Sequence, residues 1–166
     1  MNDSKNIHTT SRSATESPAV SSENKQTVVF LAQFESLDHV RQFVAHKAEI
    51  AGMDDAAVYS VQLAVDEAFS NIIEHAYGGE CLKDIRVTCE ITGPSLEITL
   101  IDCGKPFDPD EVPNPDLTAD LEDRQIGGLG LYFIHQLMDE VSFTFTSPDL
   151  GPCNVLKMVK RKEKVR

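Results

Sequence analysis

The chain has 166 residues, of which 41% are hydrophobic, so it can bury one ordinary core, and we expect a single domain with tails. Its 27 acidic residues outnumber 15 basic ones, and the formal net charge of -12 argues against a surface that binds nucleic acid or anionic lipid. The sequence has no signal peptide and no apolar run long enough to span a bilayer, so we expect a cytoplasmic protein without membrane or direct nucleic-acid partners.

The four cysteines, Cys81, Cys89, Cys103 and Cys153, follow no metal-binding spacing, so a zinc site is poorly supported. Their even number would allow a disulfide. Without an export signal, a reducing compartment and buried, unpaired thiols are the favoured interpretation.

The first part of the chain predicts a tail, a strand and a helix. Residues 1–25 hold nine Ser or Thr and few apolar residues, which predicts a disordered tail. Residues 27–34 are apolar and β-branched, which predicts a strand, and Ser36 is a candidate helix N-cap. Apolar residues at helical spacing then predict a helix that ends at Gly52.

A second helix is predicted from an aspartate at position 54 or 55 to the glycine pair at 78–79. Its apolar stripe lies beside a polar stripe of Glu67, Asn71 and His75, each four positions from the last. A carboxylate and an amide one turn apart, at the rim of a core, can hold a cation and polarise a hydroxyl. Such a stripe is also the usual solvated face of an amphipathic helix.

Residues 85–91 and 96–101 alternate with period two and predict a hairpin with one buried face. Asp102 follows at the mouth of the core, where Gly104 allows a sharp turn. A buried carboxylate there is an acceptor for an exocyclic amine, or only bonds its own turn. Residues 105–126 contain four prolines and seven acids against two bases, a composition that indicates a lid or a disordered segment.

The glycine cluster of residues 127–130 precedes a third predicted helix, and its N–H groups can approach an anion at the positive end of that helix. It matches neither the Walker nor the dinucleotide pattern, and such clusters are also loop hinges. Strands are predicted at 141–145 and 155–159, before a basic tail at 161–166. This order predicts an α+β, two-layer sandwich with a mixed, mostly antiparallel sheet and helices on one face.

Taken together, these motifs resemble the ATP-binding domain shared by gyrase, the heat-shock chaperone, histidine kinases and mismatch-repair ATPases, the GHKL superfamily. Residues 26–160 look most like its small anti-sigma-factor serine/threonine kinases. The matching segments are an N box at Glu67-x-x-x-Asn71 continuing to His75, a first glycine box at Asp102-x-Gly104, and a second at Gly127-Gly128-Leu129-Gly130. The combination at these spacings is specific.

The resemblance implies a role for each of these residues in binding Mg²⁺ and ATP. Asn71 would ligate Mg²⁺ that bridges the ATP phosphates, and Glu67 would be the general base toward an attacking hydroxyl. Asp102 would accept a hydrogen bond from the adenine amino group, beside Gly104. The phosphates would be contacted by Gly127, Gly128, Leu129 and Gly130, with His75 nearby and Arg124 reaching across from the lid.

One departure from the family concerns the turn before the last strand. Family members often have Gly-Thr there, whereas this chain has Gly151, Pro152, Cys153 and Asn154, so a hydroxyl contact at that position is unsupported.

The resemblance implies an anti-sigma regulatory factor that binds a sigma factor and phosphorylates an anti-sigma-factor antagonist protein on serine or threonine with Mg-ATP. It also suggests a homodimer. The alternative is a nucleotide-gated module that sequesters a partner without significant kinase activity; the intact Glu67 favours the enzyme. The catalytic half of a sensor histidine kinase is disfavoured, because no helical hairpin precedes residue 26.

Overall fold

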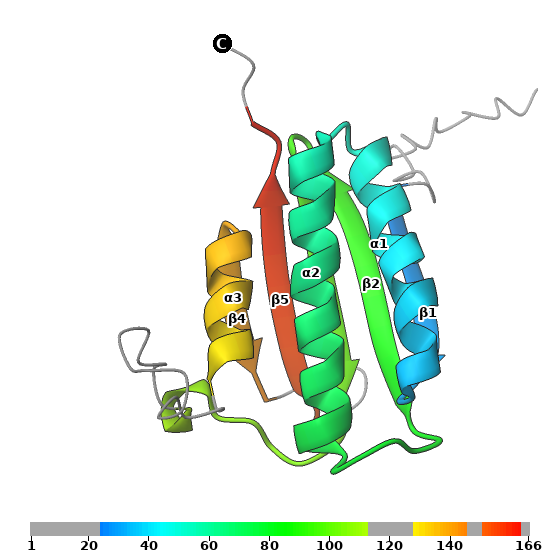
Figure 1. The fold of residues 1–166 in the computed structure, drawn as a ribbon, viewed down its shortest axis with the longest axis vertical. Helices are drawn as coiled ribbons and strands as arrows, with labels where there is room; N and C mark the ends of the chain where they lie inside the picture. Colours follow the sequence, from blue (N-terminus) through cyan, green and yellow to red (C-terminus); the bar gives the residue numbers. More distant parts are fainter. Residues whose placement is uncertain (1–23, 113–127, 146–150, 164–166) are drawn as a thin grey trace, which may run out of the picture.

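The computed structural model describes residues 24–112, 128–145 and 151–163, and these form two layers (Figure 1). Five strands make one sheet in the order β1-β2-β3-β5-β4. Their bounds are Lys25–Leu31 (β1), Asp84–Thr92 (β2), Ser95–Asp102 (β3), Glu140–Thr144 (β4) and Asn154–Arg161 (β5). Residues 1–23 and 164–166 of the predicted tails and residues 113–126 of the predicted lid lie outside the described residues.

Every pair of neighbouring strands among the described residues is antiparallel, so the prediction of a mixed sheet is wrong in that detail. The reason is the position of β5. Strands β3 and β4 are joined through a helix and run in the same direction, but β5 lies between them and is antiparallel to both. The predicted α+β class with helices on one face is confirmed.

Three helices, α1 (Leu37–Ile50), α2 (Asp55–Asn71) and α3 (Leu129–Leu137), lie side by side on one face of the sheet (Figure 1). Their apolar stripes meet the inward residues of the central strands. Side chains with no more than 1% exposure include Val44, Val65, Phe69, Ile98 and Ile134. Burying a side chain of this size contributes roughly 1.5–3 kcal/mol, so this layer supplies most of the stability. Among the described helices, none is long and apolar enough to cross a membrane.

The C-terminus of α1 and the N-terminus of α2 follow the expected signals, whereas the N-terminus of α1 does not. The Asp54 side chain accepts a hydrogen bond from the Ala57 N–H (2.8 Å) and caps α2 as predicted. Gly52 has φ of +73° after α1, a conformation that glycine adopts without steric cost. Ser36 is at the N-cap position of α1, but its hydroxyl donates to the Leu31 carbonyl (2.9 Å) instead of capping the helix.

The helix predicted to run to the glycine pair extends in helical turns as far as Ala76, but it is an α-helix only in its first part. The α-helix ends at Asn71, and Ile72–Ala76 form a π-turn in which the Tyr77 N–H donates to the Ile72 carbonyl (3.0 Å). A π-turn inserts one extra residue per turn, and this changes the direction in which the following side chains point. His75 lies within this π-turn.

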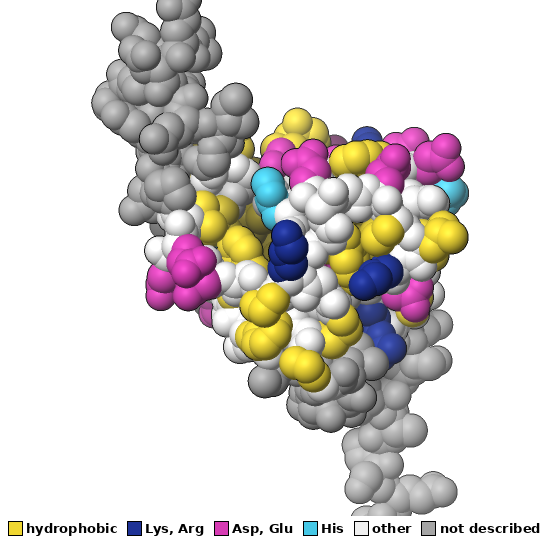
Figure 2. Space-filling model, turned by 90° about the horizontal axis from the view of Figure 1, so that it is seen from below, with side chains coloured by type: hydrophobic (Ala, Val, Ile, Leu, Met, Phe, Trp, Pro, Cys, Tyr) yellow, Lys and Arg dark blue, Asp and Glu magenta, His cyan; other side chains and the backbone are white. Residues whose placement is uncertain are grey.

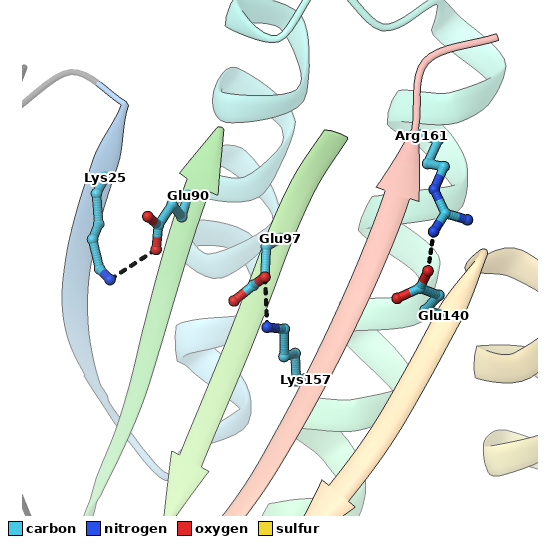
Figure 3. A network of polar contacts seen from close by, with 6 residues as sticks. All are labelled: Lys25, Glu90, Glu97, Glu140, Lys157 and Arg161. Atoms are coloured by element: carbon cyan, nitrogen blue, oxygen red, sulfur yellow. Dashed lines mark hydrogen bonds and ion pairs between the residues drawn. The ribbon is translucent and has the colours of Figure 1, made fainter. Parts of the chain in front are cut away.

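The face of the sheet opposite the helices carries cross-strand ion pairs (Figure 3). Lys25 pairs with Glu90 (2.7 Å) between β1 and β2, and Lys157 pairs with Glu97 (2.6 Å) between β5 and β3. A third pair joins Arg161 and Glu140. Exposed pairs of this kind contribute at most about 1 kcal/mol each, so their main effect is to keep this face polar.

Candidate functional site

A cavity of about 810 Å³ opens at the end of the molecule where α2 ends and α3 begins. Figure 2 shows hydrophobic side chains in a hollow on this end, with acidic side chains on one side and a histidine on the other. The size suits a nucleotide-sized ligand. Seven of the ten predicted site residues line the cavity: Glu67, Asn71, His75, Asp102, Gly128, Leu129 and Gly130. Gly104 directly precedes the lining residue Lys105 in the sequence. Arg124 and Gly127 lie outside the described residues.

At one end of the cavity, the Asp102 carboxyl is only 4% exposed. Its Oδ1 accepts hydrogen bonds from the Gly104 N–H (3.0 Å) and from the Asn154 side-chain amide (2.9 Å). Burial raises the pKa of Asp102 above its ordinary value, and these two hydrogen bonds offset part of that shift. Among the described residues no hydrogen bond to Oδ2 is seen, and Asp102 lines the cavity, so this oxygen can serve as an acceptor for an exocyclic amine.

Asn154 lines the cavity and contacts Asp102, and the sequence analysis did not single it out as a candidate site residue. It is 8% exposed and pairs with Asp102 in the β3–β5 register. Its amide NH₂ donates to Asp102 and to the Lys105 carbonyl (2.8 Å), and its amide oxygen accepts from the Phe107 N–H (2.9 Å). The signal in the sequence was the departure from the Gly-Thr turn at residues 151–154, a segment that contains this amide.

The loop after Asp102 is attached to the end of α2. A Cβ on Gly104 would lie 2.5 Å from the Ala76 carbonyl oxygen, so only glycine fits this close approach of two backbones. The Lys105 N–H donates to the same carbonyl (2.8 Å). Tyr77, which follows the π-turn, also holds this loop: its hydroxyl accepts a hydrogen bond from the Cys103 N–H (3.2 Å). The same hydroxyl donates to the Asp84 carbonyl at the start of β2 (2.8 Å).

At the other end of the cavity, α3 begins beside the polar stripe of α2. Gly128 is the N-cap with φ of +89°, and no described side chain caps this helix end, whose first N–H groups are the kind that bind an anion. A Cβ on Gly130 would lie 2.8 Å from Glu67 Oε2 and 3.3 Å from Asn71 Nδ2. The structure thus brings a carboxylate, an amide and a helix N-terminus to one place.

These residues fit a bound Mg²⁺ that is shared with a phosphate ligand. Within the described residues no three His, Cys, Asp or Glu side chains gather as a metal cluster, so this part of the chain offers no all-protein cation cage. Mg²⁺ usually takes only one or two protein ligands and completes its shell with phosphate oxygens and water. The Asn71 amide oxygen, at the lip of the space that Gly130 leaves open, is a suitable single ligand.

The described part of the predicted lid runs from residue 105 to residue 112 and contributes to the wall of the cavity. It contains one short 3-10 turn, Pro109–Glu111. The Phe107 ring packs against Phe143 of β4, with centroids 5.1 Å apart, and its N–H is held by Asn154. The base of the segment is therefore anchored to the sheet.

The prediction of four unpaired cysteines is wrong, because Cys103 and Cys153 form a disulfide across 50 residues of sequence. The physical reason is the sheet order: β5 pairs with β3, and Asp102 and Asn154 are opposite each other, so the residues just beyond them meet. Cys81 and Cys89 remain free thiols. Burial raises the pKa of Cys89 to about 12, which makes it unreactive at neutral pH.

The fold and the cavity together define an ATPase-type domain, and a family model agrees. The model of the histidine kinase-like ATPase domain matches residues 30–160, so the chain belongs to that family. A solved structure of the RsbU and RsbW domains of Rv1364c from Mycobacterium tuberculosis superimposes with a TM-score of 0.58. The superposition covers 82% of this chain and 31% of the Mycobacterium tuberculosis chain. The sequence identity is 16%, so this similarity supports the fold alone.

Within the family, the similar proteins include serine-protein kinases named RsbW, and the resemblance predicted from the sequence is confirmed. RsbW of Listeria monocytogenes is 36% identical over 102 residues, which are 59% of this chain and 65% of that protein. RsbW of Bacillus velezensis is 32% identical over 116 residues, 66% of this chain and 71% of the relative. The serine/threonine-protein kinase BtrW of Bordetella bronchiseptica is 31% identical over 85 residues, which are 51% of this chain and 60% of that protein.

Proposed function

We propose that this chain is an ATP-dependent serine/threonine protein kinase and anti-sigma factor. It binds a sigma factor and, in a competing complex, phosphorylates an anti-sigma-factor antagonist protein on serine or threonine. The domain that does this spans residues 26–160, with tails at 1–25 and 161–166, and works in the cytoplasm. Homodimerisation is part of the proposal because the resembled family suggests it.

One observation carries the enzymatic part of the proposal: Glu67 and Asn71 lie against Gly130 in the first turn of α3. A helix N-terminus with uncapped N–H groups binds phosphate. A carboxylate next to that position can accept the proton of a substrate hydroxyl as it attacks the terminal phosphate. A protein that only bound nucleotide would need the helix N-terminus but not the carboxylate.

Each residue then has a role in positioning. Asp102 orients the adenine through its amino group, and Gly104 allows the base to approach the backbone. Asn71 holds Mg²⁺, which neutralises phosphate charge when bound, and Gly128, Leu129 and Gly130 contact the phosphates together with Gly127. Phosphoryl transfer depends mainly on positioning and charge neutralisation, which this set supplies. His75 at the cavity rim and Arg124 in the lid are proposed phosphate contacts.

The test compares two variants of α2 with radiolabelled ATP and a candidate antagonist protein. Glu67→Ala should bind Mg-ATP nearly as the parent does and lose label transfer by roughly two orders of magnitude or more. Asn71→Ala should weaken Mg-ATP binding itself. Parent protein that binds nucleotide without transferring label to any candidate would indicate a nucleotide-gated sequestering module instead. Transfer by Glu67→Ala at the parent rate would disprove the base assignment.

The partners are tested by purifying the tagged chain from its native cells with ATP present and then absent. Mass spectrometry should identify a sigma factor and an antagonist protein, with their proportions changed by the nucleotide. Recovery of neither would overturn the regulatory part of the proposal and leave the ATP site unaffected.

A further inference from the structure

The disulfide Cys103–Cys153 lies directly beside the residues that hold Asp102 in place. Cys103 follows Asp102 at the end of β3, and Cys153 precedes Asn154 at the start of β5. The covalent bond and the Asp102–Asn154 hydrogen bond therefore join the same two backbone segments one residue apart.

From this placement, we propose that Cys103 and Cys153 are a redox-modifiable pair that sets the affinity of the cavity for adenine nucleotides. The inference rests on the proposed function, because it takes Asp102 as the group that binds the adenine. The oxidised form is the tight-binding form, and reduction weakens binding.

The direction follows from what holds the loop after Asp102. In the oxidised chain, residues 103–107 are tied to β5 by the disulfide and by two hydrogen bonds of Asn154, to the Lys105 carbonyl and from the Phe107 N–H; a third hydrogen bond of Asn154 holds Asp102. Lys105 and Phe107 within this loop line the cavity. Reduction leaves the hydrogen bonds but removes the covalent restraint, so the loop gains conformational freedom that a ligand must remove on binding.

The two sulfurs differ in accessibility, which defines the course of the reduction. Cys103 is exposed, whereas Cys153 is 1% exposed. A low-molecular-weight thiol is the co-reactant: its thiolate attacks Cys103 Sγ, the S–S bond breaks, and Cys153 leaves as a thiolate that takes up a proton. A second reductant thiolate attacks the mixed disulfide and releases Cys103, which is also protonated. One protein disulfide and two reductant thiols become two protein thiols and one reductant disulfide.

The remaining cysteines do not provide a competing pathway. Cys89 is buried under the helices, and its raised pKa keeps it protonated. Cys81 is half-buried and lies near Ala32, to whose carbonyl its N–H donates (2.9 Å). In a reducing compartment, disulfides that do form are usually transient or redox-sensing, which suits a pair placed at a ligand site.

The experiment measures Mg-ATP affinity by calorimetry for the full chain, oxidised and then reduced with excess dithiothreitol, together with a count of free thiols. Oxidised chain should have two free thiols and reduced chain four. We expect reduction to weaken binding by roughly three- to tenfold, the loss expected when one or two groups must be newly ordered. The double variant C103S/C153S should bind like the reduced parent and should not respond to dithiothreitol.

The single variant Cys81→Ser is the matched control, since it removes a free thiol and leaves the pair intact; it should respond to dithiothreitol as the parent does. Four free thiols in chain treated with oxidised dithiothreitol would overturn the inference, and so would equal affinities of the two redox forms. Those results leave the proposed function standing. Failure of both redox forms to bind Mg-ATP would instead overturn the proposed function, and the inference with it.

Discussion

Replacing Asn154 with alanine is the substitution for which the structure supports the most detailed prediction. The side chain makes three hydrogen bonds in a buried setting, two with backbone groups and one with the Asp102 carboxylate. Neutral bonds contribute about 1 kcal/mol each and a bond to a charged group about 2 kcal/mol, so the expected loss of unfolding free energy is about 4 kcal/mol. In a protein of this size that corresponds to a melting temperature lower by roughly 8–16 °C.

The loss should also depend on pH, because the Asn154 amide lowers a pKa that burial has raised. A carboxyl with a raised folded-state pKa costs stability at pH values above that pKa, and the cost disappears as the pH falls below the unfolded value of 3.8. Without Asn154 the pKa rises further and the cost grows. The destabilisation of Asn154→Ala should therefore be largest near neutral pH and smaller at about pH 4.

The assay is urea unfolding of parent and variant at about pH 7 and at about pH 4, which yields the free-energy difference at each pH. Lys157→Ala is the matched control on the same strand, since it removes only the exposed pair with Glu97 and should cost at most about 1 kcal/mol. A loss below about 1 kcal/mol for Asn154→Ala, or an equal loss at both pH values, would refute the account of this site.

Three further predictions concern the glycines and the carboxylate of the cavity. Gly130→Ala places a Cβ against the flexible end of Glu67, so it should change stability little but lower label transfer by at least roughly tenfold, measured with radiolabelled ATP. Gly104→Ala meets the backbone of Ala76, which cannot move away, so urea unfolding should show a loss of about 1–3 kcal/mol; unchanged stability would contradict the close approach. Mg-ATP affinity should fall on acidification through the raised pKa of Asp102, because the protonated carboxyl is a poorer acceptor, and calorimetry across that pH range would test this.

Local patterns predicted most of the elements, and the errors have specific causes. The Asp54 cap and the alternating hairpin strands are local features, and the structure confirms both. The π-turn after Asn71 was missed, because one extra residue in a single helical turn hardly changes the spacing of apolar residues along the sequence. The disulfide was missed, because Cys103 and Cys153 meet only through strand pairing.

The sequence by itself determined the chemistry available at the site and the local structures that carry it. Glu67 and Asn71 are one turn apart on any helix, and an aspartate followed by a nearby glycine marks a strand end wherever that strand lies. Only the tertiary structure decided which distant segments complete the site. The insertion of β5 between β3 and β4 puts Asn154 beside Asp102, and the packing of α3 on α2 puts Gly130 against Glu67. Such contacts depend on how whole elements bury their apolar faces, which no short stretch of sequence specifies.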